Sequence, residues 1–185
     1  MTTSQNEASM QNSHEMFKDV VDRCHKKNLD QWISNSATSH AAYLLHKLLQ
    51  IAAKRKRDIR IISGRLDRRV YDQLEDMLQE CIDAEVKMDV VVLDGVDGGE
   101  EGENPFYQKL REYSGAQCYA PKPGGETVRI PHMLVVGDSG FRYEVDPESH
   151  KAKANFNNPA IAEMLIEHFD GLIKRGAVAP APVAA

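Results

Sequence analysis

Residues 129–169 read RIPHMLVVGDSGFRYEVDPESHKAKANFNNPAIAEMLIEHF, and this stretch decides the fold. The continuous apolar run Met133–Val136 predicts a strand that is covered on both faces. Gly137–Gly140 has turn chemistry, because glycine accepts positive φ and Asp and Ser bond their own backbone. Apolar and charged side chains then alternate over 141–146, which predicts a half-buried strand. We therefore expect strand, tight turn and strand.

The second half of this stretch predicts a polar connector and a closing helix. Asn158 is a candidate N-cap and Pro159 suits the first helical position. Ile161, Leu165 and Phe169 follow at helical spacing. The stretch also holds His132, the only histidine on a predicted core strand.

The chain before this stretch predicts further strands that alternate with helices. Short apolar runs at Ile59–Ile62 and Asp89–Leu93 predict two more core strands. Helical periodicity covers Ala41–Ala52 and Arg68–Val86, and shorter segments predict a helix at 105–113 and a brief strand at 116–119. This order indicates an α/β fold with a mixed, partly parallel sheet sandwiched between helices. The parallel part would place functional groups at the carboxyl ends of its strands.

We expect one domain with two tails. Residues 1–13 are polar and aperiodic, and residues 176–185 are rich in Pro and Ala, so both ends are predicted to be disordered. Residues 14–175 form the single α/β domain with an N-terminal helical extension. Within that extension Leu29, Trp32 and Ile33 predict an apolar patch that seals a loop or a second short helix.

Composition limits the classes of function. Hydrophobic residues make up 42% and charged residues 28% of the 185-residue chain, which is typical of a soluble globular protein. The net charge of −5 argues against strong nonspecific affinity for nucleic acid, although local patches can bind. We see no membrane span and no signal peptide, and the 3 scattered cysteines disfavour disulfides and zinc sites. We therefore expect a cytoplasmic protein with no metal and no cofactor.

Three segments together resemble the phospholipase D-like superfamily. They are the strand of AAKRKRDIRIISGRL that ends at Ser63-Gly64, the strand DVVVLD, and IPHMLVVGDSGFRYEVD with the later ANFNNPAIAEMLIEHFDGL. The resemblance covers Thr38 to Ile173. It implies the α/β fold of that family.

The family's active signature is H-x-K-x-x-x-x-D, completed by a polar, Asn-containing turn. Its His is the nucleophile, its Lys neutralises phosphate charge, and two copies meet so that one His attacks while the other acts as acid. His132 matches the His, but Leu134 stands at the Lys position and Ser139 at the Asp position, with Asp138 one residue early. Asn155 falls where the polar turn is expected. If the protein is active, the resemblance implies His132, Asn155 and Asp138 as catalytic residues.

Two groups of cations are candidates for phosphate or nucleic-acid binding. The first is the basic strip, Lys54, Arg55, Lys56 and Arg57. It fits nucleic acid or an acidic protein surface, or else a helix C-terminus whose dipole favours cations. The second is Lys151 and Lys153, which follow His150 and also fit a solvated loop. The acidic segment 94–103 predicts a solvated loop, because its spacing fits no EF-hand.

Two hypotheses follow. The first is a non-catalytic binding or regulatory protein on a degenerate phospholipase D-like fold, of the kind that travels on plasmids or phages as an inhibitor of other machinery. The second is a phosphodiesterase or nuclease that uses His132 in a homodimeric site, with Arg129, Arg142, Lys151 or Lys153 replacing the lost lysine. Leu134 favours the first, because phosphoryl transfer relies on positioned positive charge. The resemblance also implies a homodimer.

Overall fold

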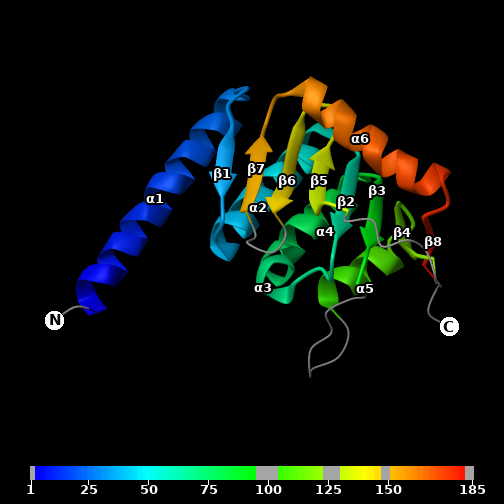
Figure 1. The fold of residues 1–185 in the computed structure, drawn as a ribbon, viewed down its shortest axis with the longest axis horizontal. Helices are drawn as coiled ribbons and strands as arrows, with labels where there is room; N and C mark the ends of the chain where they lie inside the picture. Colours follow the sequence, from blue (N-terminus) through cyan, green and yellow to red (C-terminus); the bar gives the residue numbers. More distant parts are fainter. Residues whose placement is uncertain (1–2, 95–103, 123–129, 147–150, 182–185) are drawn as a thin grey trace.

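A single eight-stranded sheet organises the molecule, with strand order β1-β7-β6-β5-β2-β3-β4-β8. The computed structural model describes residues 3–94, 104–122, 130–146 and 151–181, with side chains from Asn12 onward apart from 145 and 146. Figure 1 shows the sheet with α6 across one side and the N-terminal helix at its β1 edge. No helix in the described part of the chain is long and apolar enough to cross a bilayer.

The sheet is mixed. Parallel pairing joins β2 (Ile59–Ser63), β3 (Met88–Val92) and β4 (Ala116–Pro121). Antiparallel pairing joins β2 to β5 (Met133–Val136), then β6 (Gly140–Asp146), β7 (Lys151–Asn155) and β1 (Ile33–Asn35), and at the other edge joins β4 to β8 (Val178–Pro180). The predicted α/β fold with a partly parallel sheet is confirmed.

Helices cover both faces of this sheet. One face carries α2 (Thr38–Arg55), α3 (Arg68–Tyr71), a 3₁₀ turn (Asp72–Leu74), α4 (Glu75–Asp83) and α5 (Pro105–Glu112), with α1 (Thr3–Lys27) packed on α2. The opposite face carries α6 (Pro159–Lys174). The all-buried strand β5 contributes Leu134 and Val136 to the first core and Met133 and Val135 to the second. A strand covered on both faces has no reason to alternate polar with apolar residues.

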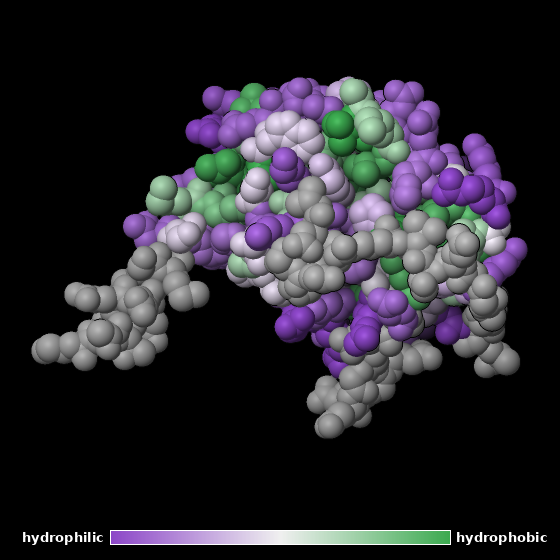
Figure 2. Space-filling view, viewed as in Figure 1, coloured by the Kyte–Doolittle hydropathy of each residue, from purple (hydrophilic) through white to green (hydrophobic). Residues whose placement is uncertain are grey.

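The space-filling view shows a largely polar surface interrupted by small apolar areas (Figure 2). Among the residues whose side chains the structure describes, the large apolar ones that remain exposed are Met16, Trp32 and Met164. Scattered exposed apolar residues are normal, so only the surroundings of each can indicate a role.

The structure contains three strands that the sequence analysis did not predict. Ile33–Asn35 was expected as a loop or short helix but pairs with β7, which itself was expected as a polar connector. The inward positions of β7 are Ala152 and Ala154, and alanine gives too weak an apolar signal to reveal the alternation. The missed C-terminal strand is β8, an edge strand that tolerates Pro180 because its outer side needs no hydrogen bonds.

The tails also differ from expectation. Helix α1 continues back to Thr3, whereas residues 1–13 were predicted to be disordered. Val178–Pro180, within the predicted C-terminal tail, pairs with β4. Residues 1–2 and 182–185 lie outside the described residues.

Candidate functional site

A pocket of about 230 Å³ lies on the α2 face of the sheet, at the carboxyl ends of β2 and β3. Its walls come from the start of α2, the loop after β2, α3, the residues that begin β5, and β6. The described lining residues that carry polar side chains are Thr38, Ser63, Arg65, Asp67, Arg69, Tyr71, Asp94, His132, Arg142 and Glu144. In a sheet with parallel strands this edge is where ligand sites usually form.

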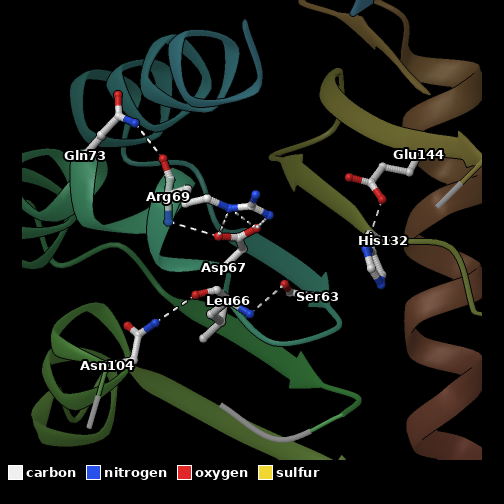
Figure 3. Close-up of polar contacts among 8 residues, drawn as sticks. All are labelled: Ser63, Leu66, Asp67, Arg69, Gln73, Asn104, His132 and Glu144. Carbon is white, nitrogen blue, oxygen red and sulfur yellow. Dashed lines mark hydrogen bonds and ion pairs between the residues drawn. The ribbon is translucent and has the colours of Figure 1, made fainter. Parts of the chain in front are cut away.

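His132 and Glu144 face each other across the β5–β6 hairpin. Leu134 pairs with Arg142 in this hairpin, and the backbone N–H of Glu144 donates to the carbonyl of His132 at 2.8 Å. The side chains follow the same register, with His132 Nδ1 2.9 Å from Glu144 Oε2 (Figure 3). A carboxylate on Nδ1 fixes the imidazole orientation and leaves Nε2 for other partners.

Gly64 lets the imidazole approach the loop after β2. A Cβ atom at Gly64 would lie 3.0 Å from His132 Nε2 and 3.1 Å from Asp94 Oδ2. Any larger residue would therefore crowd both groups, so Gly64 keeps space around Nε2. The His132 side chain is 31% exposed, which leaves it accessible from the pocket.

Arg142 places a cation beside the position where the family pattern has lysine. Leu134 is 2% exposed and lies directly opposite Arg142 on the neighbouring strand. The guanidinium is buried, with Nη1 and Nη2 each 3.3 Å from Glu144 Oε1, and Nε donates to Asn35 Oδ1 at 3.4 Å. The pocket thus holds an arginine, but one that is already paired with a carboxylate.

Glu144 remains ionised between these two partners. Burial raises the pKa of its carboxyl, but the contacts with His132 and Arg142 lower it by more, so the pKa lies below its ordinary value. Two positively polarised partners favour the charged form of a carboxyl group. The resulting array is an imidazole and a guanidinium that share one buried carboxylate.

The loop after β2 is held rigidly on the other side of the pocket (Figure 3). Ser63 Oγ accepts from the Leu66 N–H at 3.0 Å, and Asn104 Nδ2 donates to the Leu66 carbonyl at 2.7 Å. Asp67 caps α3 by accepting from the Arg69 N–H at 2.9 Å, and the same carboxylate pairs with the Arg69 guanidinium at 2.6 Å. Leu66 is buried with a φ of 55°, a backbone conformation that is unfavourable for a bulky side chain. Such strain persists only where surrounding contacts enforce it.

Two residues that the resemblance implied as catalytic lie away from this pocket. Asn155 is buried, but its Oδ1 accepts from the Asn157 N–H and its Nδ2 donates to Asp30, each at 2.8 Å. Asp138 lies in the β5–β6 turn, 74% exposed and 3.9 Å from Arg57. Asp138 lies away from the pocket because the whole of β5 stands between His132 and the turn. Of the three implied residues, only His132 lines the pocket among the described residues.

The predicted cation clusters lie at two other places. The basic strip, Lys54–Arg57, is exposed where α2 ends and β2 begins, at the opposite end of β2 from the pocket. Lys151 and Lys153 are exposed on β7, not in a loop. Residues 95–103 of the acidic segment, Arg129 and His150 lie outside the described residues.

The sequence analysis missed Glu144, although the hairpin carries a signal for it. A turn over Gly137–Ser139 fixes the register, and counting back along both strands brings Glu144 opposite His132. Among the described residues no group of three or more His, Cys, Asp or Glu side chains is arranged to hold a metal ion. Burial raises the pKa of the Cys81 thiol to about 12 and that of Cys118 to about 11, so neither is an activated thiolate.

Comparison with known proteins identifies the fold. No protein-family model matches the sequence, and no curated protein gives a significant sequence match. Solved structures do match. NUC of Salmonella typhimurium, a phospholipase D family member, aligns over 82% of this chain and 97% of its own, with a TM-score of 0.51 and 13% identity. NucT from Helicobacter pylori aligns over 82% and 99%, with a TM-score of 0.53 and 6% identity.

A third match is TrmBL2, an archaeal chromatin protein whose structure shows a novel mode of DNA binding. It aligns over 93% of this chain with a TM-score of 0.58 and 8% identity, and this chain spans 65% of the TrmBL2 chain. The class that the fold defines is therefore the phospholipase D-like α/β fold, as the sequence predicted. At these identities the likeness concerns the fold alone.

Proposed function

We propose that this protein is a non-catalytic binding or regulatory protein built on a phospholipase D-like fold. It would act by binding a partner, either nucleic acid or an acidic protein, rather than by cleaving a phosphodiester. The matched structures include a DNA-binding chromatin protein, so the fold is compatible with such a role.

The observation that carries this proposal is the charge balance of the pocket. Its described lining residues include three arginines, Arg65, Arg69 and Arg142, and three carboxylates, Asp67, Asp94 and Glu144. Arg69 is paired with Asp67, and Arg142 with Glu144. A phosphodiester that entered would meet little surplus positive charge. Stabilisation of a transferring phosphoryl group depends on such charge, and losing one preorganised contact costs roughly 3–4 kcal/mol of transition-state stabilisation.

A second candidate function is favoured by one specific feature, the orientation of His132. A carboxylate on Nδ1 with Nε2 facing the pocket is how a histidine nucleophile or base is held. A phosphodiesterase or nuclease would then use Arg142 as its cation and a second His132 from a homodimer as its acid.

Hydrolysis of bis(p-nitrophenyl) phosphate and of single-stranded DNA separates the two. We expect the wild type to show no turnover above a His132→Ala variant. Wild-type hydrolysis that disappears in His132→Ala would overturn the proposal and establish the phosphodiesterase. Hydrolysis that is equal in both proteins would exclude His132 as its source.

A further inference from the structure

A second cavity, separate from the His132 pocket, lies between α1 and the β1–β7 edge of the sheet. Its volume is about 650 Å³, within the usual range of ligand sites. Figure 1 shows α1 diverging from this edge towards its N-terminus. We call this cavity the α1–β7 groove. Its described lining residues are Ser13, Met16, Phe17, Val20, Ser34, Asn35, Ser36, His40, Lys151, Ala152 and Lys153.

The charged side chains among the described lining residues of the groove are both positive. Lys151 and Lys153 are both exposed, and no Asp or Glu occurs among the described lining residues. The remaining polar side chains are hydroxyls, one amide and one imidazole, which can all donate hydrogen bonds. The His132 pocket, in contrast, balances its arginines with carboxylates. The groove is therefore suited to an anionic ligand.

A buried amide, Asn35, lies in the wall of the groove. Asn35 is 6% exposed, and its Oδ1 accepts from Arg142 Nε. Its Nδ2 is buried and has no hydrogen-bond partner among the described residues. An unsatisfied buried donor costs about 1–3 kcal/mol, so such groups usually have a partner. Asn35 pairs with Ala152, so its side chain lies on the face of the sheet opposite Lys151 and Lys153, and the cations and aromatic ring on the lysine side carry the argument for a ligand.

Aromatic rings accompany the cations. The Phe17 and His40 rings stack at 3.8 Å within the groove wall. Beside the groove, Lys153 Nζ lies 5.6 Å from the centre of the Trp32 ring, and Trp32 is 45% exposed. Cations that track a phosphate backbone next to exposed aromatic rings are typical of surfaces that bind single-stranded nucleic acid, because every base can stack.

We infer that the α1–β7 groove binds single-stranded nucleic acid, with Lys151 and Lys153 on phosphate oxygens and a base stacked on Trp32. The inference rests on the proposed binding role and names its partner and its site. It does not depend on whether the His132 pocket hydrolyses anything.

The chain's single tryptophan provides a local readout, because a base stacked on Trp32 quenches its fluorescence. We expect a (dT)12 oligonucleotide to quench Trp32 saturably in low salt. Each lost phosphate contact lowers the salt dependence of log Kobs by about 0.7 for a single strand. Lys151→Ala/Lys153→Ala should therefore weaken binding by at least about tenfold and lower the slope by roughly 1.4.

A further double variant controls for charge, and circular dichroism controls for folding. Lys174→Ala/Arg175→Ala removes the same charge from the end of α6 and should leave the quenching unchanged. Circular dichroism of both double variants should remain that of the wild type.

Three outcomes would overturn the inference. The first is no quenching of the wild type by (dT)12 at low salt. The second is binding, seen by anisotropy, that survives Lys151→Ala/Lys153→Ala and leaves Trp32 unaffected, which would assign nucleic acid to the basic strip alone. The third is equal quenching by a poly-glutamate peptide, which would make an acidic protein segment the better ligand. Failure of the proposed function would appear instead as hydrolysis that requires His132.

Discussion

His132, Glu144 and Arg142 form a unit in which each side chain depends on the others. Arg142 and Glu144 are both about nine-tenths buried, so neither charge is well solvated. Arg142 brings its cation into the pocket from β6, opposite Leu134 on the strand that follows His132. The same geometry neutralises that cation. A guanidinium paired with Glu144 offers less positive charge to an entering phosphate than an unpaired cation would.

Removing the shared carboxylate should destabilise the protein. We expect Glu144→Gln to lower the free energy of unfolding by about 3–5 kcal/mol, because it leaves Arg142 buried without its counter-charge. Urea denaturation measures this change. The matched control is Glu163→Gln on the exposed face of α6, which should change stability by less than about 0.5 kcal/mol. An equal effect of both substitutions would contradict the importance of the buried pair.

The lowered pKa of Glu144 also predicts a pH dependence. Because the folded-state pKa lies below the ordinary value of 4.5, the unfolded state binds more protons between the two values. This contribution to stability is complete above 4.5 and is lost as pH falls through the folded-state pKa. The stability difference between the wild type and Glu144→Gln should therefore shrink on acidification below 4.5. A difference that stays constant down to pH 3 would show that Glu144 does not titrate as inferred.

At the scale of elements, the β5–β6 hairpin and α6 depend on local signals that act at their ends. Gly137, with φ of 56°, lets the turn close, and this turn sets the register that joins His132 to Glu144. Helix α6 begins at an Asn158 cap, whose Oδ1 accepts from the Ile161 N–H at 3.1 Å, with Pro159 next. Asn158 Nδ2 also donates to Asp30 at 3.1 Å, which ties the helix start to the segment before β1.

Loss of this cap should be measurable. Asn158→Ala should destabilise the protein by about 1 kcal/mol, because the first turn of α6 loses its side-chain acceptor. Thermal unfolding followed by circular dichroism measures the effect. Asn158→Ser keeps a capping oxygen and should retain most of the stability. Equal melting temperatures for Asn158→Ala and the wild type would show that the cap contributes nothing.

At the scale of the whole molecule, the His132 pocket and the two groups of cations lie at three separate places. The His132 pocket lies at the carboxyl end of β2, the basic strip at the amino end, and the α1–β7 groove at the β1 edge. The basic strip is exposed, but Arg57 lies 3.9 Å from Asp138 and Arg55 Nη1 contacts Asn28 at 3.5 Å. Because the chain as a whole carries a net charge of −5, any attraction for nucleic acid has to come from such local patches.

The strip predicts a binding behaviour of its own. If Lys54–Arg57 contacts nucleic acid, affinity falls steeply as salt rises, since each phosphate contact releases counterions. Replacing Arg55, Lys56 and Arg57 together by Ala should then remove this component while the protein stays folded. Fluorescence anisotropy with labelled DNA at several salt concentrations is the measurement. Affinity that is independent of these three residues would leave the strip as a helix end whose cations suit the dipole.

The oligomeric state is a further prediction at this scale. A homodimer is expected from the resemblance, and an active site of the family's kind would need the second His132. Light scattering at high micromolar concentration should give twice the mass of the 20.7 kDa chain. A monomer at that concentration would contradict the homodimer and also remove the second candidate function.

The sequence by itself determined the core of the fold. The apolar runs at 59–62, 89–93 and 133–136, together with the Gly-rich turn and the Asn158-Pro159 helix start, were sufficient because their periodicity and turn chemistry are local properties. It did not determine the edge strands β1, β7 and β8. Their pairing depends on partners that are distant in sequence, and their side chains give a weak pattern.

Only the tertiary structure decided the composition of the pocket and the groove. The resemblance implied Asn155 by its place near the polar turn and Asp138 one residue before the motif position, but neither lines the His132 pocket. Arg142 reaches the pocket, and Lys151 and Lys153 reach a groove whose other wall is α1, more than a hundred residues earlier in the chain. Such groups of residues arise when sheet pairing brings remote segments together. The spacing of residues along one segment carries no information about a wall that another segment supplies.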